Sequence, residues 1–168
     1  MPVTDYTPTV AQVAALVRNR TRDANGNVLG TFQTAADGRT TPTSEQVTEL
    51  IQDAVNEAYP VFGDDIPDNP GDTTRPGYDK DTIRKAATRN VAMRAAALVE
   101  LTYFADQVGS GKSPYPQYQD SFEKGLPRLG KAITEAQQGD EVGTGDDAPG
   151  PAWEFPLPDP QSFGTRAF

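Results

Sequence analysis

Apolar side chains in this chain recur every three or four residues, which is the spacing of an amphipathic helix. The recurrence is clearest in one stripe that comprises Val47, Leu50, Ile51, Ala54, Val55 and Ala58. The fifteen prolines and fifteen glycines lie mostly outside the periodic stretches. The sequence therefore predicts an all-α fold whose core is smaller than the chain length suggests. We expect Val47, Leu50, Leu98 and Leu101 to be among its buried residues.

The first two helices have recognisable starts. Residues 8–18 are expected to form a helix capped by Thr7, with Pro8 at the first helical position. The second helix should follow a capping box, in which Thr43 and Gln46 stand three residues apart.

The third helix should be the longest, over residues 79–108, and its apolar residues occupy adjoining faces. Such a broad apolar surface is typical of a central helix packed on several sides. A fourth helix is expected over residues 115–137, with a bend or break near Leu126 and a division into two short helices as one outcome. The break is expected because three residues interrupt the periodicity, namely Gly125, Pro127 and Gly130.

Two segments between the helices are expected to be irregular. Residues 21–41 contain the tight-turn pair Asn25 and Gly26, which predicts a small hairpin or extended loop that projects from the helical body. Residues 60–78 are expected to form a long loop rich in proline and glycine. Three apolar residues should pin the start of that loop to the core, namely Val61, Phe62 and Ile66.

Helical periodicity ends near Gly139, which divides the chain into a helical domain over residues 1–138 and a C-terminal arm over residues 139–168. The arm is rich in proline and acidic, with only Arg166 as a basic residue, and this composition is typical of an unfolded tail. It nevertheless carries five large apolar residues, Trp153, Phe155, Leu157, Phe163 and Phe168. We interpret it as a docking arm that orders against another protein. The alternative is that the arm folds back on its own helical body.

Composition restricts the chemistry that is open to this chain. It has no cysteine and no histidine, so disulfides, thiolate metal sites and the commonest general base are absent. The phosphate-loop-like sequence at Gly111, Lys112 and Ser113 has Asp106 where the motif requires glycine. We therefore expect no enzymatic activity and no catalytic, cofactor or metal site. Without a signal peptide or an apolar run of bilayer length, we expect a soluble protein with no membrane partner.

Charges of opposite sign occur on different helices. The second helix carries an acidic row at Glu45, Glu49, Asp53 and Glu57, which is either a solvated face or a docking face for a basic neighbour. The first half of the third helix is basic, at Lys80, Arg84, Lys85, Arg89 and Arg94. These cations could bind nucleic acid, or neutralise the acidic helix or tail of a neighbouring copy. The net charge of −9 favours neutralisation of a neighbouring copy over binding of nucleic acid. Candidate contacts between subunits are Arg84, Lys85, Arg89, Glu49 and Asp53.

Three stretches carry a resemblance to a known family. The first is the helix from Thr7 to Val17. The second is the segment before the second helix, which contains Gly30, Thr31 and Phe32 and continues from Arg39 through Thr43 to Val47. The third is the alanine-rich helix that ends at residues 98–104. In their order and spacing they resemble the head-to-tail adaptor (head–tail connector) proteins of long-tailed bacteriophages, especially those infecting actinobacteria.

The resemblance implies a four-helix adaptor domain without enzymatic activity. Copies would form a ring, about twelvefold, beneath the portal protein, in the neck of a virion assembled in the host cytoplasm. The ring would extend the channel through which DNA passes and would receive a stopper or tail-completion protein. By position, the loop over residues 21–41, with Asn25, Gly26, Leu29 and Phe32, would face the channel or the next ring. The C-terminal arm would grasp the portal.

A second interpretation of the function of this sequence remains open beside the adaptor. The chain could be a small helical DNA-binding packaging factor, similar to a terminase small subunit, that uses the basic half of the third helix.

Overall fold

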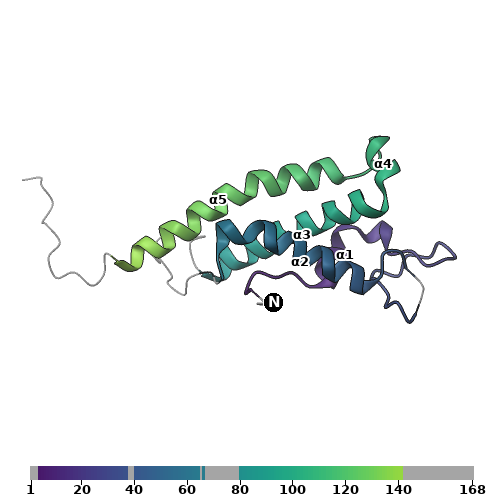
Figure 1. Ribbon diagram of the computed structural model, residues 1–168, viewed down its shortest axis with the longest axis horizontal. Helices are drawn as coiled ribbons and strands as arrows, with labels where there is room; N and C mark the ends of the chain where they lie inside the picture. The colour runs from purple at the N-terminus through teal and green to yellow at the C-terminus, as the bar shows by residue number, and fades with distance from the viewer. Residues whose placement is uncertain (1–3, 38–39, 65, 67–79, 142–168) are drawn as a thin grey trace, which may run out of the picture.

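The computed structural model describes residues 4–37, 40–64, 66 and 80–141, which form an elongated bundle of helices (Figure 1). Its elements are α1 (Val10–Leu16), the short 3-10 helix η1 (Arg18–Arg20), α2 (Ser44–Phe62), α3 (Lys80–Tyr103), α4 (Ala105–Gly109) and α5 (Tyr115–Glu141). The described residues contain no strand, so the expected all-α class is confirmed for this part of the chain. The aromatic arm residues of the sequence prediction lie outside these ranges.

Helix α3 is the centre of the bundle and packs against α1, α2 and α5. Figure 1 shows α5 along one side of α3 and α2 on another. The buried residues of α3 are distributed around its circumference, and they are Ile83, Ala87, Asn90, Val91, Ala92, Ala95, Ala96, Ala97, Val99 and Glu100. The prediction of a central helix packed on several sides is confirmed. The many alanines explain how the neighbouring helices fit closely around it.

Helix α1 begins later than predicted. Its N-cap is Thr9, whose hydroxyl accepts from the Gln12 backbone N–H at 3.2 Å, while the Gln12 side chain accepts from the Thr9 N–H at 2.7 Å. The predicted cap at Thr7 is therefore wrong. The Thr7 hydroxyl lies 2.9 Å from the hydroxyl of Thr4 instead. Because capping needs an acceptor at the N-cap and a glutamine or glutamate three residues later, Thr9 and Gln12 form the complete box.

Helix α2 starts as predicted, at a capping box formed by Thr43 and Gln46. It continues through Pro60 to Phe62, so the predicted loop does not begin at residue 60. The helix ends at Gly63, whose φ of 74° is a left-handed conformation that suits glycine. Of the three predicted pins, Phe62 and Ile66 are buried, whereas Val61 is 39% exposed and only partly fulfils the prediction.

The chain before α1 is anchored at this end of α2. Tyr6 is fully buried, its hydroxyl donates to the Gly63 carbonyl at 2.7 Å, and its ring meets the Phe62 ring edge-on at 5.2 Å. Burial raises the pKa of the Tyr6 hydroxyl. Nearby, the Ile66 N–H donates to the Asp5 carboxylate at 3.3 Å. The first described residues are therefore part of the core.

The helix predicted over residues 79–108 is divided in two. Phe104 leaves helical geometry, with φ −133° and ψ 33°, and α4 follows it. Neither glycine nor proline stands at this position, so no local signal marked the break. A tertiary contact accompanies it, because the Phe104 ring lies 4.3 Å beneath the guanidinium of Arg20. The same helix exposes 43% of Leu101, which contradicts its predicted burial, while Leu98 packs partly buried against the core.

Helix α5, in contrast, is one continuous helix through Pro127, and the predicted break near Leu126 is wrong. Two of the supposed interruptions are sites of close packing. A Cβ added at Gly125 would lie 2.1 Å from Asn90 Nδ2 on α3, and one at Gly130 would lie 2.4 Å from Val61 Cγ1 on α2. The glycines therefore let α5 approach its neighbours. Pro127 is exposed, so its ring is directed away from the packed interior.

A first prediction concerns this close approach. Replacing Gly125 with alanine should lower the free energy of unfolding by about 1–2 kcal/mol, because overpacking outweighs the gain of up to about 1 kcal/mol in helix propensity. Asn90 has little room to move, since it is 5% exposed and its Nδ2 donates to the Ser121 and Phe122 carbonyls at 3.3 and 3.4 Å. Urea denaturation measures the change.

Two controls accompany this variant. Gly109→Ala changes a helical glycine with nothing within 4 Å of the added Cβ, and it should be close to neutral. On an Asn90→Ala background the cost of Gly125→Ala should disappear. A cost that persists there would show that the clash with Asn90 is not its cause.

Candidate functional site

A groove of about 540 Å³ lies between α1, with the residues just before it, and the first half of α3. Thr7, Thr9 and Gln12 contribute polar groups from the N-terminal side. Apolar surface comes from both helices, through Ala15 and Leu16 of α1 and Ala92 of α3. A volume of this size is within the range of about 300–1,000 Å³ that is usual for binding sites.

The α3 side of the groove is basic. Arg84, Lys85 and Arg89 all line it, and none of its lining residues is acidic. Arg84 forms an exposed ion pair with Asp81 at 2.8 Å. Lys85 and Arg89 are exposed and form no ion pair with any residue in the described ranges. The sequence prediction grouped these three cations on one helix, and the structure brings them to one groove.

Arg94, another of the five predicted cations, lies elsewhere. Arg94 donates to both carboxylate oxygens of Glu57 on α2, at 2.6 and 2.8 Å, and also to the side chain of Gln119 on α5. The hydrogen bond with Glu57 raises the pKa of Arg94. Arg89 is five residues away and so about 140° around the helix from Arg94. Arg94 therefore ties α3 to α2 and α5, whereas the groove cations face α1.

The acidic row of α2 is also divided by the structure. Glu57 pairs with Arg94 of the same chain. Glu45, near the start of α2, accepts from the Ala35 N–H at 3.0 Å, and hydrogen bonds from its own backbone N–H and the Thr43 hydroxyl lower the pKa of its carboxyl. Glu49 and Asp53 are exposed and form no ion pair with another described residue. These two are the members of the row that remain available for an external partner.

A buried polar cluster joins η1, α3 and α4 at the other end of the bundle. Glu100 of α3 is 1% exposed, and its carboxylate accepts from Arg20 Nε and Nη2, both at 2.7 Å. The Ser113 hydroxyl donates to the same carboxylate at 2.6 Å, and Arg20 Nη1 donates to Gln107 of α4 at 2.6 Å. Both charges are therefore paired and hydrogen-bonded, which is the arrangement that makes burial of ions tolerable.

Tyr118 lies beside this cluster on α5. Its hydroxyl donates to the Leu16 carbonyl at the end of α1, at 2.7 Å. Burial raises the pKa of Tyr118, and the nearby Glu100 charge adds to the effect. Tyr118 and the cluster together thus tie η1 and α1 to α3, α4 and α5. Sequence reasoning missed it, because Arg20 and Glu100 are eighty positions apart and neither belongs to a motif.

The predicted loop projects from one end of the bundle (Figure 1), and it is not a regular hairpin. Residues 21–37 contain a single antiparallel bridge, between Arg22 and Val28, in place of a ladder. The tight turn at Asn25 and Gly26 is confirmed, with a Gly26 φ of 84° and its N–H donating to the Asp23 carbonyl at 2.9 Å. Asn25 and Gly26 are exposed at the turn, and Leu29 is half-buried. Phe32 is 5% exposed and belongs to the core, so it is not presented to a channel.

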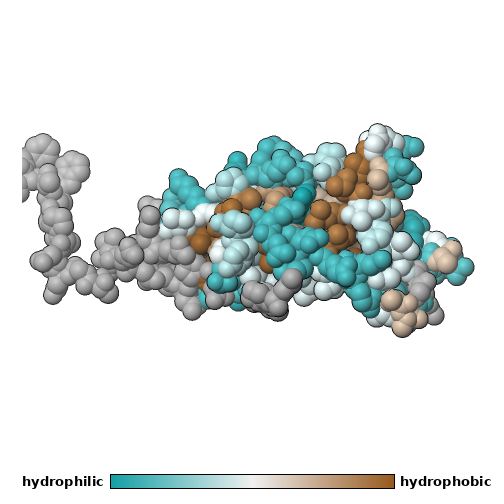
Figure 2. Space-filling model, in the orientation of Figure 1, coloured by the Kyte–Doolittle hydropathy of each residue, from teal (hydrophilic) through white to brown (hydrophobic). Residues whose placement is uncertain are grey.

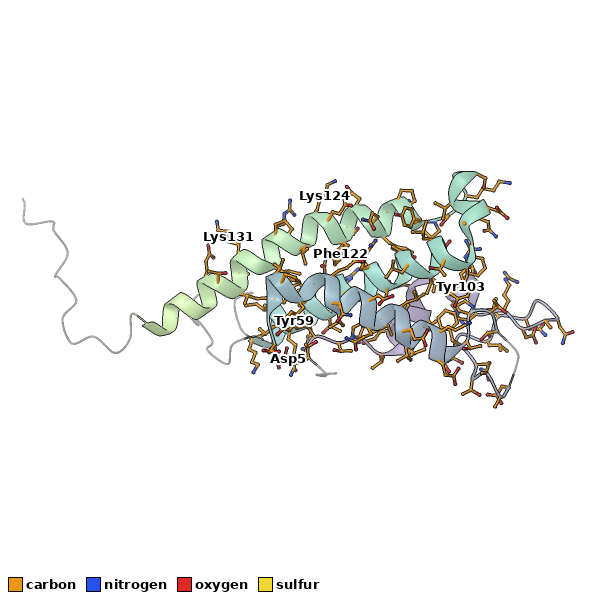
Figure 3. All side chains as sticks on the ribbon, in the orientation of Figure 1. Asp5, Tyr59, Tyr103, Phe122, Lys124 and Lys131 are labelled. Atoms are coloured by element: carbon orange, nitrogen blue, oxygen red, sulfur yellow. The ribbon has the colours of Figure 1, made fainter. Side chains whose placement is uncertain are left out.

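Figure 3 shows the side chains on the ribbon, with Phe122 between α5 and α3 and the lysines Lys124 and Lys131 on the outer surface of α5. Figure 2 shows that apolar surface on the same face is confined to strips framed by hydrophilic side chains. Within the described ranges no three histidine, cysteine or acidic side chains are grouped so as to hold a metal ion. None of the helices described has the length and apolarity that crossing a membrane requires.

No protein-family model matches this chain, and no curated protein or solved structure matches it either.

Proposed function

We propose that this chain is a structural virion protein of a tailed bacteriophage. Copies form a ring beneath the portal protein, which connects the capsid to the tail and extends the DNA channel. The proposal rests on the resemblance of three sequence stretches to head-to-tail adaptors. In the fold, these stretches become α1, the lead into α2, and α3, which pack together as one body.

The observation that most supports assembly into a ring is the separation of opposite charges. Glu49 and Asp53 are exposed on α2, whereas Lys85 and Arg89 line the groove on the α1 side of α3. Two different complementary surfaces on one molecule favour a heterologous contact, in which the acidic surface of one copy meets the basic surface of the next. Such a contact repeats around a ring when its rotation closes. Many weak contacts made together on a circular template then become stable.

Contacts with the other neck components follow the same proposal. The turn at Asn25 and Gly26 is exposed at one end of the bundle, where it would meet the channel or a stopper protein. The arm over residues 139–168 would bind the portal through Trp153, Phe155, Leu157, Phe163 and Phe168. Aromatic residues dominate interface hot spots, and their burial would offset the entropy that the arm loses on ordering. The mechanism is association alone, with no bond made or broken.

The second candidate, a DNA-binding packaging factor, has one supporting observation, the basic groove. Only Arg84, Lys85 and Arg89 contribute to it, because Arg94 is engaged by Glu57. Three phosphate contacts would give a salt dependence with a slope of about −2.7, whereas strong duplex binders make about 6–10 contacts. The overall charge of −9 opposes such binding further. Tight and steeply salt-dependent binding of duplex DNA by the full chain would favour this alternative.

Deletion of residues 140–168 tests the adaptor proposal. The truncated chain should keep its helical circular dichroism and a cooperative melt, because the core cluster lies within the described residues before the deletion. It should fail to join the portal protein of the same phage, since the arm that carries the contact is gone. Negative-stain electron microscopy of portal mixed with each chain measures the outcome.

A full-length control separates arm chemistry from arm length. Replacing Trp153, Phe155, Leu157 and Phe163 with alanine should abolish attachment as completely as the deletion does. A truncated chain that still assembles normally into necks would refute the assigned role of the arm.

A further inference from the structure

The groove between α1 and α3 has the chemistry of a receptor for an acidic, partly apolar chain. Lys85 and Arg89 have no anionic partner among the described residues, and Ala15 and Leu16 of α1 offer accessible apolar surface. Two cations beside apolar surface, without a compensating acid in the lining, favour a ligand that carries both carboxylates and large apolar side chains.

The segment after α5 has this composition. Residues 142–168 contain four acids, Asp146, Asp147, Glu154 and Asp159, against the single basic residue Arg166. Glu154 lies between Trp153 and Phe155, and Asp159 follows Phe155 by four residues. Carboxylates and aromatic rings therefore occur in the same short stretch, matched in sign to the groove cations.

The segment also starts close enough to reach the groove. Helices α3 and α5 are antiparallel, because Asn90 contacts the Phe122 carbonyl while Glu100 contacts Ser113. From Phe122 to the end of α5 at Glu141 is nineteen residues, or about 29 Å of helix. The twelve residues from 142 to 153 span up to about 40 Å when extended. Trp153 can therefore return along α3 to the level of Arg89, and the adjacent Glu154 comes within reach of the groove cations.

Covalent connection favours the chain's own segment over that of another copy. A short flexible linker gives an effective concentration in the millimolar range, which is far above the concentration of a free protein in dilute solution. We propose that residues 142–168 dock in cis into the groove between α1 and α3, with Glu154 and Asp159 facing Lys85 and Arg89. This inference goes beyond the virion role and does not depend on it.

Trp153 reports directly on this docking, because it is the only tryptophan in the chain. In the full-length protein at low salt, its fluorescence should be blue-shifted and protected from acrylamide. Replacing Lys85 and Arg89 with glutamate should shift the emission to the red and raise the quenching constant severalfold. Raising the salt concentration to 1 M, where the Debye length falls to about 3 Å, should act in the same direction.

A matched control makes the same charge change elsewhere. Lys124 and Lys131 are 68% and 78% exposed on the outer surface of α5 (Figure 3), and replacing both with glutamate should leave the emission unchanged. Reversing the arm charges, with Glu154→Lys and Asp159→Lys, should restore the blue shift in the Lys85→Glu, Arg89→Glu background. That rescue identifies the two partners of the contact.

Three outcomes would overturn the inference. The first is a wild-type Trp153 that is fully exposed to quencher. The second is a protected Trp153 that does not respond to the groove substitutions. The third is protection of Trp153 that grows with protein concentration, which would assign the groove to the arm of a second copy. Each of these leaves the portal test untouched, since the deletion experiment measures attachment and this one measures the free chain.

Docking in cis also bears on the proposed ring. The same cations, Lys85 and Arg89, would be covered by the arm in the free chain and available to a neighbouring copy after the portal has taken the arm.

Discussion

Replacing Val47 with aspartate is expected to unfold the helical domain. Val47 lies on α2 with none of its surface exposed and belongs to the core cluster. Burying a carboxylate without a partner costs several kcal/mol, whereas the whole free energy of unfolding of a domain is only about 5–15 kcal/mol. Far-UV circular dichroism and a thermal melt at neutral pH should show loss of helix and of the cooperative transition.

Leu101→Asp is the matched control for this variant. It makes a similar change, from an aliphatic side chain to a carboxylate, on the central helix, but the leucine is already 43% exposed. Its effect should stay within about 0.5 kcal/mol, as is usual for surface substitutions. Leu50 and Leu98 are half-buried, so aspartate there should have intermediate effects. Equal destabilisation by Val47→Asp and Leu101→Asp would contradict the orientation of α3 described above.

Replacing Arg20 with methionine is expected to lower the free energy of unfolding by about 3–5 kcal/mol, because it leaves a buried charge without its partner. The Glu100 carboxylate, 1% exposed, would keep only the Ser113 hydroxyl as a donor. The packing of the guanidinium over the Phe104 ring would be lost at the same time. Urea denaturation followed by circular dichroism measures the change. An unchanged dependence of the free energy of unfolding on urea concentration would show that the folded state itself persists.

Two further variants identify the cause of this loss. Adding Glu100→Leu to Arg20→Met should recover most of the stability, since an apolar pair of similar volume often replaces a buried ion pair without cost. Lys124→Met removes an exposed ion pair within α5, with Asp120 at 2.8 Å, and should cost about 0.3–0.5 kcal/mol. A double variant that is less stable than Arg20→Met alone would count against an unpaired Glu100 as the cause.

The sequence was sufficient where the determinants of structure are local. The box at Thr43 and Gln46 predicts the start of α2 because both partners lie within one turn. The same spacing occurs at Thr9 and Gln12, so the correct start of α1 was present in the sequence. The prediction failed there because Pro8 also suits the first position of a helix. Of these two local signals, the complete capping box at Thr9 and Gln12 sets the start of α1.

Features that depend on contacts between helices could not be predicted from the local sequence. Gly125 and Gly130 weaken a helix considered in isolation, yet in the bundle they admit Asn90 and Val61. Phe104 ends α3 without any breaking residue. For the groove, the cations of α3 were foreseen as a group, but their separation from Arg94 depends on how α1, α2 and α5 surround the helix.

The hydrogen bond from Tyr118 to the Leu16 carbonyl has a consequence for synthesis on the ribosome, because its two residues are 102 positions apart. At about 5–20 residues per second, some 5–20 s pass between the translation of the one and of the other. Throughout that interval the nascent α1 segment, with the apolar Val13 and Val17, has no α5 to cover its end. Chaperones that bind nascent apolar segments would therefore have their longest opportunity at the N-terminus, and folding would be completed only as the last helix leaves the exit tunnel.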